Sequence, residues 1–522
     1  MHYPGTKPAK DFQAEVDALI ARKSERNTLG VADFKGFHIP GGVDFCNRVF
    51  PDVACFMGAV FHEPVKFSGA RFTQDVSFVQ ATFSAADFSS AVFEGNGIFP
   101  RATFGREVDF SGAAFRRTAD FREARFGSIA AFGRSELNCP AFESSVFVGN
   151  VSFIAAKLSG DANFRNVTFR SQVNCFHSVF SGPADFSFAK CLDTASFSQA
   201  TLEAANFDSA EFSKSADFGQ VLARRHAAFQ RTKFQGVTFE SAHLYEGASF
   251  DSATFSGDVE FRRATFGPLP DDSSAARGAV IADFTGAKFE KPTAVWFSQV
   301  NKDAGVGLRA RFLNCDVEQI HLDDVHWHRR RGGRMVLQDE LDVVEGRKTV
   351  AGTTTECRRS EHELVAIAYR QLINNFDKVR ALDLAEDCFC GAMEMKRLDP
   401  NQTWLSRTVL SAYKIASSYG SSYVQAFFVL VAIVIAASVI FATPWLGLGP
   451  AQGNPGAVQM ASSWLRRYPA GLFHSLEVAT FQRDAVYYFA WRRGRLMVIA
   501  EQTLVPIQVA LLLLALRRRF RR

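Results

Sequence analysis

The sequence of this 522-residue chain predicts neither disulfide bridges nor a secretory signal peptide. Its nine cysteines are an odd number, lie scattered between Cys46 and Cys390, and define no disulfide framework. The first 23 residues contain no apolar core segment, so we expect no secretory signal peptide. These absences favour a reducing compartment, in which the thiols stay free.

An excess of charge of one sign is missing as well. The net charge is only +5, and residues 45–266 hold 21 basic against 23 acidic residues. A nucleic-acid-binding groove requires clustered Lys and Arg side chains. The balance therefore argues against nucleic acid as a partner.

Catalytic motifs are also absent. The sequence contains no nucleophile elbow, no Walker-type phosphate loop, no His-Glu-x-x-His metal motif and no paired catalytic carboxylates. Residues 321–328 include several His and Asp side chains, but Leu322 and Trp327 take the interior positions there, which turns the polar ones outward. We therefore expect no enzymatic activity, no metal ion and no cofactor.

Phenylalanine is what the chain has in abundance. It recurs every five or six residues from Phe34 to Phe266 and fills 36 of the 44 positions of this ladder. The other eight positions hold Ile39, Leu137, Leu158, Cys175, Cys191, Leu202, Ala223 and Leu244. No helix and no amphipathic strand has this period. A solenoid does, because each short segment forms one flat face and then turns a corner.

The neighbours of each ladder position agree with that interpretation. A small or β-branched residue commonly stands two residues before the Phe, and Asp or Asn often stands one residue before it. Alternation along an extended segment places the small residue and the Phe on one side and the Asp on the other. The Phe and Ala side chains are therefore expected to fill the interior, with the Asp side chains in water.

This pattern resembles the pentapeptide-repeat family, whose motif is Ala, then Asp or Asn, then Leu or Phe, then two variable residues. Residues 86–90 and 205–209 match the motif in full. The resemblance covers about residues 34–328 and implies a β-solenoid, a right-handed quadrilateral β-helix with one pentapeptide on each face. The six-residue steps depart from the motif, and we interpret the extra residue as a small bulge at a corner.

Composition divides the chain into five segments. We expect a helical cap over residues 1–33, the solenoid over 34–328 with a loop insertion at 267–281, a polar linker over 329–359, an α-helical hairpin over 360–398, and a membrane module over 399–522. The cap would cover the open backbone edge of the first coil. In the hairpin, Ser360 and Glu363 form a capping-box pattern ahead of apolar residues at helical spacing.

Two segments of the membrane module are long and apolar enough to be transmembrane helices. The first, about 423–446, has an uncharged core with Tyr423 and Trp445 at its ends. The second, about 496–516, is less apolar and runs into an arginine-rich tail at 517–522. Basic residues outside both spans favour two cytoplasmic ends, although the loop between the spans is also basic. We expect a multi-pass protein with its solenoid in the cytoplasm.

The C-terminal layout is similar to that of bacterial pentapeptide-repeat membrane proteins. The similarity lies in residues 369–372 (Tyr-Arg-Gln-Leu), residues 394–397 (Glu-Met-Lys-Arg), the two spans and the closing arginine-rich tail. It implies the bacterial inner (cytoplasmic) membrane as the location. It names an architecture and implies no particular mechanism.

The segment between the spans supplies the candidate functional residues. Residues 470–481 are apolar but too short to cross, which is typical of a re-entrant or interfacial helix. A short helix between two spans is the plan of a two-helix cation-channel pore, although the potassium filter sequence is missing. Glu501 and Gln508 share one face of the second span and predict a polar seam turned away from lipid, which meets the same seam of another subunit or lines water. The alternative for Glu501, five residues from the start of the span, is a position at the level of the lipid headgroups. The candidate membrane seam or pore residues are Glu501, Gln508, His474 and Thr480.

Three functions stay open. The first is a membrane-anchored scaffold or sensor that binds a cytoplasmic protein partner and whose two spans form a homo-oligomer in the lipid bilayer, with a channel-like pore as one form. The second is a plain membrane-tethered protein-interaction module without a pore. The third, implied by the family resemblance, is a DNA mimic that protects a topoisomerase. It requires a strongly acidic rod, and the balanced charge disfavours it.

Overall fold

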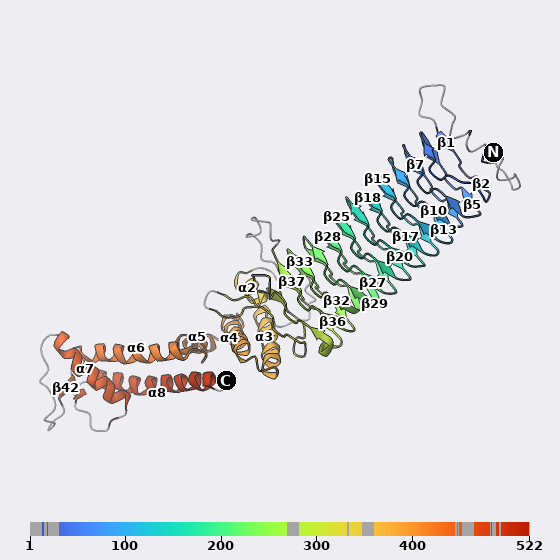
Figure 1. The fold of residues 1–522 in the computed structure, drawn as a ribbon. Coiled ribbons are helices and arrows are strands. Elements are labelled where there is room, and N and C mark those ends of the chain that lie inside the picture. Colours follow the sequence, from blue (N-terminus) through green and yellow to red (C-terminus); the bar gives the residue numbers. More distant parts are fainter. Residues whose placement is uncertain are drawn as a thin grey trace. The chain divides into compact units, whose positions relative to one another are not determined.

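The computed structural model describes most of the chain, in two compact units, Met1–Gly352 and Thr353–Arg522. The described residues are 13–14, 18, 31–268, 281–330, 333–346, 360–443, 446, 448–450, 464–480, 482, 487–489 and 492–520. The first unit is a β-solenoid, and the second is helical (Figure 1).

Short parallel strands stacked coil upon coil form the solenoid, from β1 (Val31–Asp33) and β2 (His38–Ile39) to β41 (Ala310–Arg311). A strand pairs with the strand one coil away. Ala86 of β10 (Ala86–Asp87) is in register with Val65 of β6 (Val65–Lys66) and with Val108 of β14 (Val108–Asp109). Four ladder steps of five or six residues complete each such coil, which confirms the solenoid inferred from the ladder.

Phenylalanine rings pack the interior in stacks along the solenoid. Phe88 stacks on Phe67 and on Phe110, with ring centroids 4.8 and 4.9 Å apart and the planes within 3° of parallel. Across the core, Phe88 meets Phe78 and Phe99 edge to face at 5.6 and 5.7 Å. Both geometries are favourable for aromatic pairs, so each ring is fixed by neighbours within and between stacks.

The eight positions of the ladder that are not Phe keep the inward register. Each is at most 3% exposed: Ile39, Leu137, Leu158, Cys175, Cys191, Leu202, Ala223 and Leu244. Burial raises the pKa of the Cys191 thiol to about 12 and raises that of Cys175 further, so both side chains are uncharged apolar fillers.

Two of the four corners of a coil are tight turns. At these corners the second residue after the ladder position has a positive φ, as at Gln80 (57°), Arg101 (56°) and Glu123 (57°). The amide of the next residue then donates to the ladder residue's carbonyl, as from Ala81 to Phe78 at 3.0 Å. Left-handed backbone is uncommon for residues other than Gly, and here the stacked coils impose it repeatedly.

Some six-residue steps follow long strands that run through a corner. The long strands at six-residue steps are β15 (Ala114–Asp120), β25 (Val179–Asp185) and β29 (Glu211–Asp217). Each pairs with a long strand that spans a five-residue step, namely β18 (Glu136–Ala141), β28 (Thr201–Asn206) and β32 (Lys233–Thr238). Their pairing shifts register between Phe115 and Thr118, between Phe180 and Pro183, and between Phe212 and Ser215. The bulge interpretation is confirmed at these three steps.

The last coils depart from a simple count of five and six. After the loop insertion the count of five and six resumes at Phe284 and Phe289 and predicts Val295 as the next ladder position. That prediction is wrong: Phe297 stacks on Phe261 at 4.7 Å, and Val295 takes the small-residue position before it. A short 3₁₀ turn, η2 (Pro292–Ala294), adds residues at the preceding corner. Beside Phe266, the side chain of Asn301 makes the hydrogen bonds that a strand of the next coil would otherwise make. Its Oδ1 accepts from the Phe266 amide and its Nδ2 donates to the Phe266 carbonyl, both at 2.7 Å.

A helix covers the C-terminal end of the solenoid, within the stretch predicted to be a polar linker. This helix, α2 (Gln338–Val344), buries Asp339, whose carboxylate accepts a 2.8 Å hydrogen bond from the Phe312 amide. Arg311 bridges Asp283 and Asp342 beside it, at 2.9 and 2.8 Å. The linker prediction is therefore wrong over α2, where polar side chains satisfy the open edge of the last strand.

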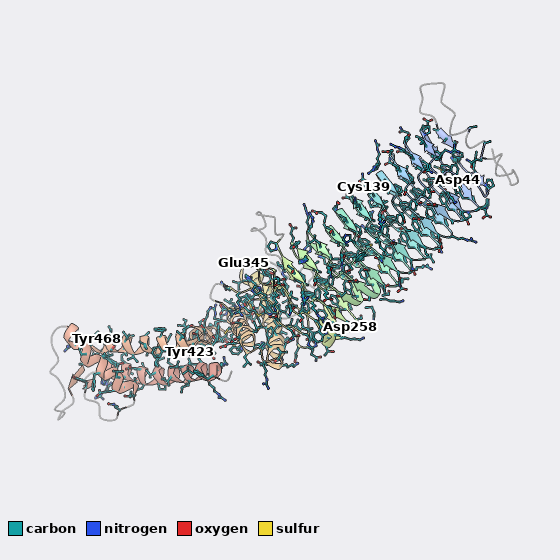
Figure 2. All side chains as sticks on the ribbon, viewed as in Figure 1. Asp44, Cys139, Asp258, Glu345, Tyr423 and Tyr468 are labelled. Atoms are coloured by element: carbon teal, nitrogen blue, oxygen red, sulfur yellow. The ribbon has the colours of Figure 1, made fainter. Side chains whose placement is uncertain are left out.

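Only parts of the predicted N-terminal cap lie among the described residues. Gln13, Ala14 and Ala18 are helical. The Gln13 side chain accepts from the Asp44 amide at 3.1 Å and donates to the Asp44 carbonyl at 3.3 Å. Asp44 lies toward the N-terminal end of the solenoid (Figure 2). These bonds satisfy part of the open edge, as a cap would.

In the second unit, the hairpin predicted over 360–398 corresponds to α3 (Glu361–Lys378) and α4 (Leu382–Leu398). The predicted cap forms, since the Ser360 side chain accepts from the Glu363 amide at 3.1 Å. Tyr369, Leu372 and Phe376 of α3 are fully buried, as is Cys388 of α4.

The rest of the second unit comprises α5 (Trp404–Ser417), α6 (Tyr423–Phe441), α7 (Trp464–Ala479) and α8 (Arg492–Phe520), with an antiparallel pair of short strands, β42 (Leu448–Pro450) and β43 (Tyr487–Phe489). Helices α6 and α8 lie side by side, and α7 packs at the end away from α5 (Figure 1). Tyr423 marks the α5 end of this bundle, and Tyr468 lies toward the other end (Figure 2).

Candidate functional site

The interior of the α6–α7–α8 bundle holds most of the candidate residues. Two of its helices are long and apolar enough to cross a membrane: residues 423–441 of α6, with a mean hydropathy of 2.8, and residues 492–518 of α8, with 1.8. Only 17% of the apolar window of each helix is buried within the protein. Most of the apolar surface of both helices is therefore exposed, as it is on helices that could span a membrane.

Gln508 joins three helices at the α5 end of the bundle. Its side chain is 3% exposed, and Nε2 donates 2.8 Å hydrogen bonds to the carbonyls of Ala416 and Ala426. Ala416 belongs to the last turn of α5, where carbonyl groups lack partners within the helix. Gln508 thus supplies a donor that the α5 terminus requires, and it fixes α8 against the start of α6.

Glu501 faces α7 in the same interior. Its side chain is 3% exposed, and one oxygen accepts a hydrogen bond from the Ser475 hydroxyl. The Ser475 oxygen also lies 3.2 Å from the Val434 carbonyl of α6. A single buried hydroxyl therefore connects the carboxyl group of α8 with the backbone of α6.

His474 is also buried, at 4% exposure, but it points to a different set of groups. Its Nδ1 lies 3.5 Å from a carboxylate oxygen of Glu477, and its ring meets Phe441 edge to face at 5.3 Å. Thr480 is exposed at the end of α7, and its hydroxyl donates to the Leu476 carbonyl at 2.7 Å. Of the four predicted residues, Thr480 is therefore the one outside the interior.

Close helix packing makes this arrangement possible. A Cβ atom on Gly471 would lie 2.5 Å from the Ser438 carbonyl oxygen, so only glycine allows α7 to approach α6 this closely. Gly471 and Ser475 are four residues apart, the small-residue spacing typical of closely packed membrane helices. Ser438, Gly471, Ser475 and Glu477 were not singled out from the sequence, although this spacing was a signal that could have found the Gly and the Ser.

A second polar cluster lies beside the bundle, at the junction of α4 and α5. Glu394 of α4 accepts hydrogen bonds from Arg397 (2.8 Å), Lys414 of α5 (2.8 Å) and the Tyr419 hydroxyl (2.7 Å). Burial raises the pKa of Glu394, but these three donors outweigh burial and hold the pKa at about 2. The carboxylate is therefore charged at neutral pH and ties the hairpin to α5.

The tip of α8 reaches the same junction. Arg518 donates to the Tyr419 carbonyl at 3.2 Å, and its guanidinium lies 4.8 Å from the centre of the Phe389 ring of α4. The C-terminal end of α8 is thus attached to the hairpin and to the turn before α6. Among the described residues, no group of three or more His, Cys, Asp or Glu side chains is placed to hold a metal ion.

The repeat region defines the class of the protein. The family model described as Pentapeptide repeats (9 copies) matches residues 49–92, 176–221 and 227–268. These ranges lie wholly within the β-solenoid, so the chain carries pentapeptide repeats on a β-solenoid fold, as its Phe ladder predicts. No curated protein matches the chain.

Proposed function

We propose that this protein is a membrane-tethered interaction module, in which α6 and α8 cross the bilayer and the pentapeptide-repeat solenoid binds a protein partner. The two long apolar helices support the tether. Pentapeptide-repeat solenoids present stacked, regular faces without a catalytic cleft, and such faces serve binding. The balanced charge of this solenoid favours a protein over nucleic acid as the partner.

The hydrogen bonds of Gln508 are the observation that favours a tether over a pore. A pore built from several copies would need polar side chains facing the central axis, away from the interior of each copy. Gln508 and Glu501 instead face inward, with partners on α5, α6 and α7 of the same chain. The two polar side chains of the predicted seam therefore have hydrogen-bond partners within one chain and need no second subunit.

Association between copies remains the second candidate, and Gln502 favours it. This side chain is exposed on α8, one residue after the buried Glu501 and within the apolar stretch. Side-chain amides facing lipid gain from hydrogen bonds to another helix, by roughly 1 kcal/mol. Gln502 is thus the residue through which two copies would meet.

Two measurements on purified protein separate these functions. The tether predicts one copy per detergent micelle by light scattering and no conductance in planar bilayers. Oligomerisation through α8 predicts a larger assembly in wild type that Gln502→Leu dissociates and the neighbouring Thr503→Leu leaves intact. Conductance that depends on Gln502 would establish the pore and displace the tether.

We also propose the bacterial inner membrane as the location, with the solenoid in the cytoplasm and the α7–α8 loop outside. Cys139 is exposed on the solenoid, and Gln482 is exposed between α7 and α8. A membrane-impermeant thiol reagent should label Gln482→Cys in intact cells, in a Cys139→Ser background. It should label native Cys139 only after permeabilisation. The reverse pattern would invert the topology.

A further inference from the structure

One face of α5 is apolar and exposed, although the helix belongs to a compact unit. Trp404, Leu405, Val409 and Ile415 are 77%, 58%, 60% and 67% exposed. At about 100° per residue they fall within an arc of roughly 140°, together with the small Ala412. Thr408 lies in the same arc, and its hydroxyl donates to the Trp404 carbonyl at 2.9 Å. A largely apolar stripe of this kind on a single helix needs an apolar cover.

The opposite face of α5 is held by the rest of the unit. Arg407 donates to the Asp399 carbonyl at 2.7 Å, and Lys414 pairs with Glu394 at 2.8 Å. Thr403 caps the N-terminus by accepting from the Ser406 amide at 3.3 Å. The polar face therefore points toward α4, which leaves the apolar stripe directed away from the hairpin.

The C-terminal end of α5 lies where both spans end. Ser418, Tyr419 and Gly420 all have positive φ values, of 46°, 59° and 77°, so the chain turns sharply before α6 begins at Tyr423. Gln508 of α8 binds the last turn of α5, and Arg518 binds the turn itself. This end of α5 is therefore fixed at the level where α6 enters and α8 leaves the proposed membrane.

We propose that α5 is an interfacial helix that lies on the bilayer with Trp404, Leu405, Val409 and Ile415 in the boundary between headgroups and acyl chains. This inference rests on the proposal that α6 and α8 span the membrane. Interfacial helices have one apolar face that enters about 5–10 Å and a polar face with basic residues. Arg407 and Lys414 provide that polar face, and Trp404 is a residue type enriched at this depth.

Lipid is the occupant that the position of α5 favours over a protein. After the turn, the chain enters α6, whose residues Phe427 and Phe428 are themselves 51% and 65% exposed. A partner helix seated on α5 would have to replace lipid at the edge of the same bilayer. Because Glu394 of the hairpin bonds to Lys414 of α5, an α5 that lies on the bilayer also holds the hairpin at the membrane surface.

A depth measurement tests this placement in the full-length protein. A fluorescent amino acid is introduced singly at Val409 on the stripe, at Ile435 near the middle of α6, or at the exposed Asn374 of α3 as the aqueous control. Each protein is reconstituted in nanodiscs of phosphatidylethanolamine and phosphatidylglycerol. Quenching is measured with lipids brominated near the headgroup, with lipids brominated near the chain end, and with aqueous iodide.

The expected result is that headgroup-proximal bromine quenches the Val409 label most, chain-end bromine quenches the Ile435 label most, and iodide quenches only the Asn374 label strongly. Iodide quenching at Val409 with deep quenching at Ile435 would overturn the interfacial helix and leave the spans standing. Protection of Val409 from both iodide and bromine would mean that protein covers the stripe, which also overturns it. Loss of bromine quenching at Ile435 would refute the membrane tether itself.

Discussion

Replacing Ala223 with Asp tests the inward register of the solenoid at its smallest ladder position. Ala223 is 0% exposed, and its strand β30 (Leu222–Ala223) places it between Leu202 of β28 and Leu244 of β33 (His243–Tyr245). A carboxyl group at this position would therefore enter an apolar column. Its charged form loses hydration without gaining an ion-pair partner in that column.

The size of the effect follows from the titration of a buried carboxyl group. Full burial commonly raises such a pKa by about 3–5 units from the ordinary Asp value near 3.9. At about 1.4 kcal/mol per unit, ionisation alone should lower the free energy of unfolding at pH 7 by about 4 kcal/mol, in addition to a pH-independent cost of overpacking. Because the folded-state pKa is raised, stability is lost as the pH rises above about 4, and the ionisation part of the loss should be less than half as large at pH 5.

Urea unfolding of the full-length protein in detergent, followed by circular dichroism at pH 5 and pH 7, measures both quantities. Arg224→Asp is the matched control, since the adjacent side chain is exposed and should change stability by about 0.5 kcal/mol or less. Ala223→Leu should cost about 1–3 kcal/mol by overpacking, equally at both pH values. Wild-type stability of Ala223→Asp beside a destabilised Arg224→Asp would show that the register is displaced by one residue.

Three further changes probe the ends of the solenoid and the membrane module. Burial raises the pKa of Asp339 to about 7, so the cap formed by α2 should weaken as the pH rises from about 4 to about 7. Asp339→Asn should abolish this dependence in hydrogen-exchange measurements of the last coils. The pKa of Glu394 is depressed, so its contribution is present above pH 4.5 and lost as the pH falls toward about 2. Glu394→Gln should therefore destabilise the hairpin by about 1–3 kcal/mol at pH 7, by less at pH 3 and by little at pH 2. Gln508→Leu should leave membrane insertion intact but speed proteolysis at the α5–α6 turn, and unchanged proteolysis would remove Gln508 from its joining role.

The sequence determined the solenoid and its register because the interior of a narrow coil admits few side chains. Thirty-six Phe residues spaced five or six apart indicate a short-coiled solenoid, and the inward positions of Cys175 and Ala223 could be predicted from the spacing alone. The count failed only after η2, where two extra residues enter a corner and Phe297 takes the position assigned to Val295. A ladder of single residues contains no information on the length of an irregular corner.

The corners themselves were beyond prediction for a different reason. In a sequence, Gly or Asn usually indicates a position with a positive φ value. Gln80, Arg101 and Glu123 have positive φ values although their residue types do not predict them. The stacking of coils imposes this backbone, because each turn must superimpose on the turns above and below it. The same limit applies to α2, whose short polar sequence becomes helical against the last coil and has no apolar period of its own.

The candidate site shows where helical periodicity stops being informative. A spacing of seven residues placed Glu501 and Gln508 on one face of α8 and predicted that this face avoids lipid, and both side chains are indeed buried. The spacing could not tell which groups they would meet, since a neighbouring helix, a second copy and a water-filled pore all satisfy a polar face equally. The answer depends on Ser475, which reaches Glu501 because Gly471 lets α7 press against α6, and on the turn after α5, which brings Ala416 to Gln508. Both contacts join segments that lie more than 25 residues apart in the sequence. The polar residues of one helix therefore predict that a hydrogen-bonding partner exists, but only the tertiary structure shows which residue that partner is.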